Sequence, residues 1–150
     1  MMKRSSRQWV TATIVAGILA SGISAGVAAR SGDAGGAVTV SVKYTGKGDV
    51  DSNHRIWVWL FDTPDIGPGA MPIAETSTDK NGGEVAIDSS ADTVWIAVAY
   101  DEAGGFGGMA PPPSGSPVAI YSAPTGAPLA VKVGQAEKVT ITFSDKDRMP

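Results

Sequence analysis

The chain has 150 residues, 12 of them basic and 15 acidic, with no cysteine and one histidine, His54. The lack of cysteine excludes disulfides, cysteine nucleophiles and thiolate metal sites, and a single histidine excludes a multi-histidine zinc site within one chain. The acidic balance leaves no basic patch, which argues against binding of nucleic acid or of an anionic membrane surface.

The first residues have the three-part pattern of an export signal. Three basic residues precede an apolar run at 9–23, and Val27 and Ala29 then stand at the spacing that a signal peptidase reads. We therefore predict a signal peptide over 1–29, cleaved after Ala29, and a periplasmic or secreted protein. The alternative is an uncleaved membrane anchor, because the apolar stretch approaches spanning length. Cleavage would leave a chain of net charge −6, from nine basic and 15 acidic residues.

Next, a Gly-, Ser- and Asp-rich stretch at 30–37 predicts a flexible linker. Residues 38–44 alternate between apolar and polar side chains, which predicts a half-buried strand. The polar stretch 45–55 predicts a connection. Residues 56–61, Ile-Trp-Val-Trp-Leu-Phe, are too few for an ordinary helix and predict a strand buried on both faces.

The rest of the chain alternates between turn signals and short apolar segments. A second long apolar strand is expected at 93–100, and the tail at 145–150 is polar, so we expect it to be disordered. Shorter strands are expected at 73–77, 84–87, 118–121, 129–133 and 139–143, separated by loops at 62–72, 79–83, 88–92 and 101–117.

About seven short strands without any helical period predict an all-β protein. The expected form is an antiparallel β-sandwich in a single domain over 38–144. The two most apolar strands, 56–61 and 93–100, should be central neighbours. Their two faces then differ: one carries aliphatic side chains that form the core between the sheets, and the other carries Trp57, Trp59, Phe61, Trp95, Ala97 and Ala99.

The aromatic row formed by Trp57, Trp59, Phe61 and Trp95 is the main candidate for a binding surface. Left bare, it would be an apolar patch that monomeric proteins seldom expose. Three kinds of cover could hide it: the protein's own Pro-rich segment at 110–128, a partner protein, or a flat ligand such as a sugar. Because most aromatic surface in small domains is core, the favoured expectation is burial under the Pro-rich segment.

The order of these features resembles the prealbumin-like, or carboxypeptidase regulatory-like, β-sandwich domains of exported bacterial proteins, which are Ig-like in architecture. The resemblance implies a non-catalytic accessory, adhesive or structural module. Some members carry an acidic loop suited to calcium after the strand that matches 94–100. The segments that carry the resemblance to this family are 38–44, 54–61, Asn81-Gly82-Gly83, 94–101, Gly134-Gln135 and 139–143.

A calcium site is the one metal site that the residues suggest. Asp62, Asp101 and Glu102 directly follow central strands, and we expect that they could converge at one end of the sandwich, together with Asp65. Calcium needs several carboxylate and carbonyl oxygens in one place. The alternative is that these are solvated loop carboxylates, and no other cofactor is expected.

Catalytic motifs are weak. A serine–histidine–aspartate triad would have to use His54, and no Gly-x-Ser-x-Gly elbow occurs. The glycine-rich run 104–108 precedes prolines rather than a helix, so it lacks the features of a phosphate loop. The sequence thus predicts an exported, non-enzymatic module with a structural or protein-binding role. The alternative is a carbohydrate- or small-ligand-binding module that uses the aromatic row, and an enzyme is a distant third.

Overall fold

A computed structural model describes residues 35–67, 69–108, 110–135 and 138–150, which all belong to one compact unit, 31–150. The predicted signal peptide, its cleavage at Ala29 and most of the predicted linker lie outside the described residues. Within these ranges the chain forms eight strands and no helix, so the all-β prediction is confirmed. Accordingly, no described part of the chain is a helix that could cross a membrane.

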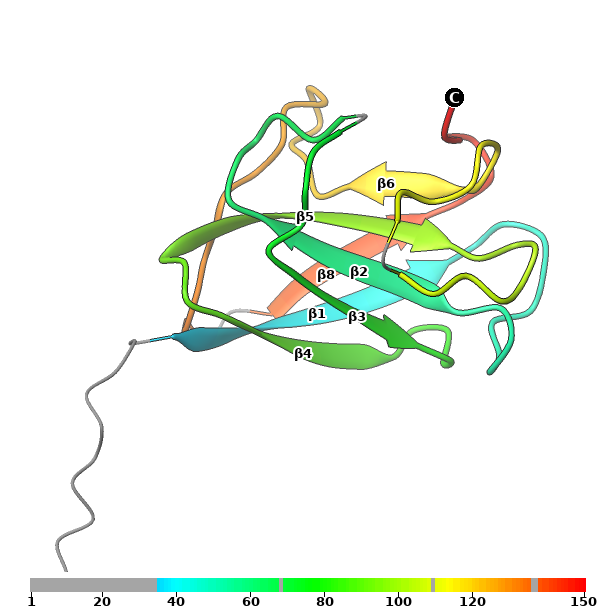
Figure 1. The fold of residues 1–150 in the computed structure, drawn as a ribbon, viewed down its shortest axis with the longest axis horizontal. Helices are drawn as coiled ribbons and strands as arrows, with labels where there is room; N and C mark the ends of the chain where they lie inside the picture. Colours follow the sequence, from blue (N-terminus) through cyan, green and yellow to red (C-terminus); the bar gives the residue numbers. More distant parts are fainter. Residues whose placement is uncertain (1–34, 68, 109, 136–137) are drawn as a thin grey trace, which may run out of the picture. The chain divides into compact units, whose positions relative to one another are not determined.

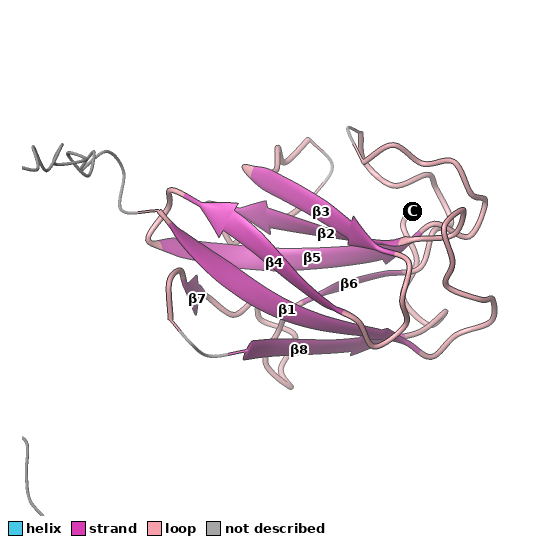
Figure 2. Ribbon diagram, turned by 90° about the horizontal axis from the view of Figure 1, so that it is seen from below, coloured by secondary structure: helices cyan, strands magenta, loops and turns pink. Residues whose placement is uncertain are grey.

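The strands form two sheets that face each other (Figures 1 and 2). One sheet has the order β4-β1-β8 and the other β3-β2-β5-β6, with the short β7 pairing with the start of β5. In chain order the strands are β1 (Gly36–Tyr44), β2 (Ile56–Phe61), β3 (Ala74–Thr78), β4 (Glu84–Ser89), β5 (Thr93–Tyr100), β6 (Val118–Ile120), β7 (Val131–Lys132) and β8 (Lys138–Phe143).

One strand pair departs from the predicted antiparallel arrangement. All ladders are antiparallel except that between β1 and β8, which is parallel and pairs Thr39 with Lys138 through to Tyr44 with Phe143. The alternation of apolar residues is the same in either direction of pairing, so the sequence pattern held no information on this point. The count of about seven strands also falls one short of the eight described.

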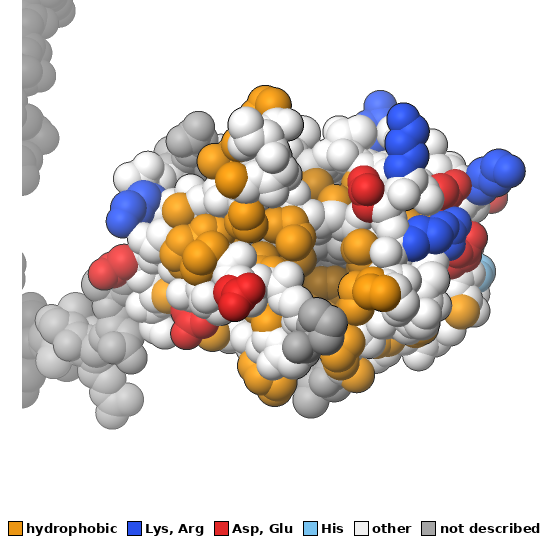
Figure 3. Space-filling model, turned by 90° about the horizontal axis from the view of Figure 1, so that it is seen from above, with side chains coloured by type: hydrophobic (Ala, Val, Ile, Leu, Met, Phe, Trp, Pro, Cys, Tyr) orange, Lys and Arg blue, Asp and Glu red, His pale blue; other side chains and the backbone are white. Residues whose placement is uncertain are grey.

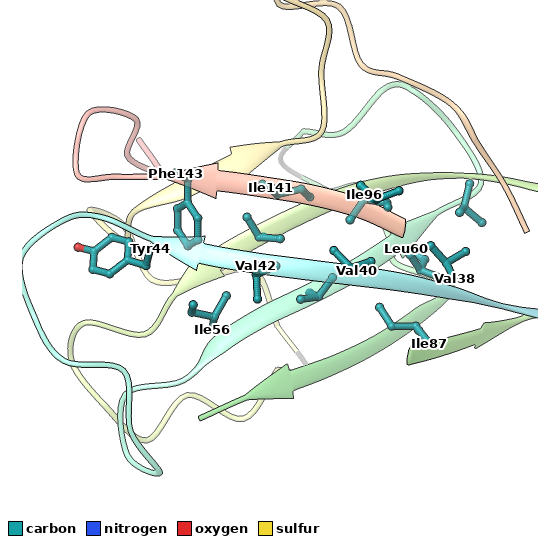
Figure 4. Close-up of a cluster of buried hydrophobic side chains, with 14 of the residues drawn as sticks. Val38, Val40, Val42, Tyr44, Ile56, Leu60, Ile87, Ile96, Ile141 and Phe143 are labelled. Atoms are coloured by element: carbon teal, nitrogen blue, oxygen red, sulfur yellow. The ribbon is translucent and has the colours of Figure 1, made fainter. Parts of the chain in front are cut away.

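The core lies between the two sheets (Figure 4). Aliphatic side chains at alternate positions of β1, β2, β5 and β8 meet there, because side chains at every second position of a strand share a face. This confirms the predicted inward face of β2 and β5. Most of these side chains have 5% or less of their surface exposed, namely Val38, Val40, Val42, Ile56, Val58, Leu60, Val94, Ile96, Val98, Val139 and Ile141.

The tail after β8, which was predicted to be disordered over 145–150, makes backbone hydrogen bonds to the segment that leads into β6. Gly115 N donates to Met149 O at 2.9 Å, Met149 N to Ser116 O at 3.0 Å, and Val118 N to Asp147 O at 2.9 Å. The tail therefore runs along the segment that leads into β6. Backbone pairing of this kind needs no apolar side chains, so the polar composition of the tail did not predict it.

Candidate functional site

The aromatic row lies on the outer face of the β3-β2-β5-β6 sheet, as predicted. In the antiparallel ladder between β2 and β5, Trp57 pairs with Ala99, Trp59 with Ala97, and Phe61 with Trp95. A large ring thus stands opposite a small alanine at two successive positions, which leaves room for the rings to lie over the sheet.

Burial divides the row into two classes. Trp59 and Phe61 are buried, with 5% and 6% of their surface exposed. Trp57 and Trp95 are half-buried. The rings of Trp57 and Trp59 are stacked, with centroids 6.3 Å apart. The accessible aromatic surface is therefore limited to parts of Trp57 and Trp95.

The glycine-rich loop 101–108 covers the part of the row formed by Trp57 and Trp59. The Phe106 ring meets Trp57 edge-on, with centroids 5.5 Å apart, and lies 6.1 Å from Trp59. Trp59 Nε1 donates to Gly108 O at 3.2 Å. The predicted cover, segment 110–128, contributes Val118 to this cluster, whereas Phe106 and the loop after β2, through Ile66 and Ala70, supply the rest. Segment 110–128 is therefore only a part of the cover, and the contribution of Phe106 was missed because the sequence could not show where its ring points.

Gly108 and Asp101 hold this loop in place. A side chain on Gly108 would overlap the Trp57 ring, and its φ of +79° also favours glycine. The Asp101 side chain, only 4% exposed, accepts hydrogen bonds from Gly104 N at 2.9 Å and Phe106 N at 2.8 Å. Both carboxylate oxygens of Asp101 thus fix the backbone that carries Phe106.

Two further features of this region bear on ligand binding. Trp57 Nε1 is buried and makes no hydrogen bond to the part of the chain that the structure describes. On the loop itself lies an open hollow of about 360 Å³, whose lining includes Phe106, Ala103, Ala110 and Pro113. A buried indole N–H normally has an acceptor, so this one stands out as an unused donor.

The candidate calcium ligands do not converge. Because β2 and β5 are antiparallel, Asp62 follows one end of the ladder and Asp101 the other, about 20 Å apart at the usual rise per residue. Asp101 is engaged with its own loop, and Glu102 forms an ion pair with Arg148 at 2.7 Å. The predicted meeting of Asp62 and Asp65 with Asp101 and Glu102 is therefore wrong. Among the described ranges, no group of three or more acidic, histidine or cysteine side chains is placed to hold a metal ion.

His54 lies in a loop turn. Its Nδ1 is 3.1 Å from the Asp51 carboxylate, which also accepts the backbone N–H groups of Asn53 and His54 at 2.8 Å. Those two backbone hydrogen bonds are the main reason why the pKa of Asp51 is lowered. The only histidine in the sequence is therefore part of a loop turn, and Asp51 is the residue whose side chain forms that turn.

A second aromatic cluster, which was not predicted, closes the end of the core at which β1, β5 and β8 finish. The rings of Tyr44 and Tyr100 stack at 4.2 Å, and Phe143 packs against Tyr44 at 5.2 Å. The Tyr44 hydroxyl donates to the Asp145 carboxylate, and Lys47 N donates to the same carboxylate at 2.9 Å. Burial raises the pKa of Tyr44, and the hydrogen bond from Tyr44 lowers the pKa of Asp145. The signal available in the sequence was two tyrosines, each ending a predicted apolar strand.

Comparison with known proteins identifies no relative: no family model, curated protein or solved structure matches the chain.

Proposed function

We propose that the protein is an exported, non-enzymatic β-sandwich module with a structural or protein-binding role. The observation that carries this proposal is the position of Phe106, which lies on Trp57 and Trp59 and is held there by Asp101. The most prominent candidate binding surface is thus largely occupied by the protein's own loop. A row of aromatic side chains used in this way stabilises a domain rather than recognising a ligand.

The placement of the charged groups supports the same role. Asp51, Asp101 and Asp145 each accept hydrogen bonds from loop backbone, and Glu102 pairs with Arg148 of the tail. These side chains hold loops against the sheets. On the face shown in Figure 3, apolar side chains gather around a hollowed middle, and most of the lysine and arginine side chains lie toward one end, among acidic ones. Such a mixed surface suits a protein partner.

Two finer parts of the proposal rest on the sequence. The resemblance to prealbumin-like, Ig-like sandwiches favours an accessory module, and two facing sheets with one shared core accord with it. The leader at 1–29 favours a periplasmic or secreted location. N-terminal sequencing of the protein recovered from the periplasm or medium should begin at Arg30. Recovery of an intact leader in the membrane fraction would contradict export by cleavage.

The structural role is tested by removing the cover. Phe106→Ala should lower the melting temperature and increase binding of a hydrophobic dye, because it uncovers Trp57 and Trp59. Pro113→Ala, a change elsewhere in the lining of the same hollow, serves as the control and should do neither. If Phe106→Ala melts like the wild type and binds no more dye, the loop is not a structural cover.

A carbohydrate-binding role is the second candidate, favoured by the unpartnered Trp57 Nε1 and the hollow beside Phe106. For a sugar to bind here, Phe106 would have to move aside; the sugar ring would then stack on Trp57, and a hydroxyl that reached the edge of the indole would accept its N–H. The test is tryptophan fluorescence across a glycan panel, repeated with Trp57→Phe, which keeps a ring but removes the donor. A shift that Trp57→Phe abolishes supports this role. Unchanged fluorescence across the panel contradicts it and leaves the structural proposal standing.

A further inference from the structure

The side chain of Asn81 completes the hydrogen-bond ladder between β1 and β4. Gly82 N donates to Val42 O at 2.8 Å, and Val42 N donates to Gly83 O at 3.1 Å. Two residues further along β1, Tyr44 N donates to Asn81 Oδ1, and Asn81 Nδ2 donates to Tyr44 O, both at 2.8 Å. The amide group of Asn81 therefore takes the place of a peptide unit in the last rung of the ladder.

Asn81 and Gly82 are also the residue pair most prone to deamidation. The nitrogen of the following residue attacks the Cγ of asparagine, a new C–N bond forms, and the side-chain nitrogen leaves as ammonia. Water then opens the resulting succinimide ring to aspartate or isoaspartate. Glycine in the second position favours the reaction because it has no side chain to obstruct the attack and is conformationally permissive.

The ladder immobilises both reacting groups. The attacking nitrogen, Gly82 N, is held by its hydrogen bond to Val42 O, and the amide it would attack is held at both its oxygen and its nitrogen by Tyr44. Attack needs this end of the ladder to open first. We propose that Asn81 is a latent deamidation site, kept unreactive by the fold, whose conversion irreversibly releases the end of β1 from β4.

The release is one-way because neither product can restore the rung. Aspartate still accepts from Tyr44 N, but it cannot donate to Tyr44 O and places a negative oxygen next to that carbonyl. Isoaspartate in addition lengthens the backbone by one carbon. The side chain of Tyr44 belongs to the cluster with Tyr100 and Phe143, so the loss reaches the end of the core.

The test compares deamidation in the folded protein with that in the protein unfolded in urea, by peptide mass spectrometry that separates aspartate from isoaspartate. The sequence has only one other asparagine, Asn53, which is an internal reference in each sample. In the folded protein, deamidation at Asn81 should be at least about tenfold slower than in urea, since reaction waits for local opening. Equal rates at Asn81 in the two states would overturn the proposal.

A variant that loosens the turn without changing the Asn-Gly pair provides the second arm. Thr78 Oγ1 accepts from Lys80 N at 3.1 Å within this turn. Thr78→Val removes that hydrogen bond at constant size and should speed deamidation of the folded protein by about two- to tenfold, the worth of one hydrogen bond. Thr140→Val, at an exposed position of β8, is the matched control and should leave the rate unchanged. Equal rates in these two variants would also overturn the proposal.

Discussion

Single residues fix the loop over the aromatic row. Gly108 has to be glycine because the Trp57 ring occupies the space that a side chain would need and because its φ is positive. Asp101 has to be a carboxylate because two backbone N–H groups point at its two oxygens. These two residues explain why a loop rich in glycine, which costs conformational entropy to order, still takes one conformation over the sheet.

Gly108→Ala should destabilise the protein by about 2–4 kcal/mol, from overpacking against Trp57 together with the positive φ. Urea denaturation monitored by tryptophan fluorescence measures this change. Gly105→Ala is the matched control, because Gly105 has a similar φ of +82° but open space around it. It should cost only about 1–2 kcal/mol. If the two variants are equally stable, the contact with Trp57 is not what restricts residue 108.

The hydrogen bond between Tyr44 and Asp145 should make stability depend on pH in the acid range. The lowered pKa of Asp145 in the folded state adds stability above the ordinary carboxyl range, and this gain is lost as the pH falls through the folded value. Tyr44→Phe should remove this component, so its stability relative to the wild type should be lowest near neutral pH and recover below about pH 4.

The control for this measurement is Tyr100→Phe, which removes a hydroxyl that donates to Asp49 O at 2.9 Å instead. Its stability difference from the wild type should stay constant across the same acid range. Thermal melts at a series of pH values measure both variants. A constant difference for Tyr44→Phe would show that Asp145 gains nothing from Tyr44.

At the scale of elements, the short strand β6 depends on the C-terminal tail, a neighbour that the sequence did not predict. β6 has three residues and pairs with β5 on one side. The tail runs beside the segment leading into it and accepts hydrogen bonds from Gly115 N and Val118 N. Arg148 strengthens this arrangement through its ion pair with Glu102. An unprotected strand edge invites pairing with other chains, and the tail covers part of this one.

Removing 146–150, which leaves Asp145 in place, should therefore destabilise the protein by about 3 kcal/mol, from three lost backbone hydrogen bonds at about 1 kcal/mol each. Hydrogen exchange should show loss of protection at the Gly115 and Val118 amides. Arg148→Ala keeps the backbone bonds, so protection at those two amides should persist. Protection that survives the truncation would contradict a bracing role for the tail.

At the scale of the whole molecule, the two-sheet arrangement separates groups that the sequence suggested would meet. Strand ends that look equivalent along the chain lie at opposite ends of an antiparallel ladder, as Asp62 and Asp101 show. The same ladder brings together residues about 40 positions apart, such as Trp59 and Ala97. Direction of pairing thus decides which loop residues can act together.

Calcium should have no effect on stability through these carboxylates. Melting curves of the protein in millimolar calcium and in a chelator should coincide, because a bound ion would raise the melting temperature by mass action. Magnesium in place of calcium serves as the control for ionic strength. A rise specific to calcium would reveal a site that Asp62, Asp101 and Glu102 do not form together.

Much of this arrangement could be predicted because it depends on side-chain alternation within single strands. Val58 and Leu60 face the core, whereas Trp57 and Trp59 face outward. This follows from the two-residue period of side chains along a strand. What could not be predicted depends on contacts between distant segments. The approach of Phe106 to the tryptophans, the pairing of the tail and the parallel β1–β8 ladder leave no local pattern in the chain.

The parallel ladder between β1 and β8 has a mechanical consequence. The first and last strands lie side by side and run the same way, with six residue pairs in register from Thr39–Lys138 to Tyr44–Phe143. Tension applied through the segments that flank them pulls the two strands along their length in opposite directions. The hydrogen bonds are then loaded in shear and must break together, rather than one at a time as in peeling. Pulling by force spectroscopy from both ends should therefore meet higher resistance than pulling between Gly36 and Ser89, which would peel β1 from β4.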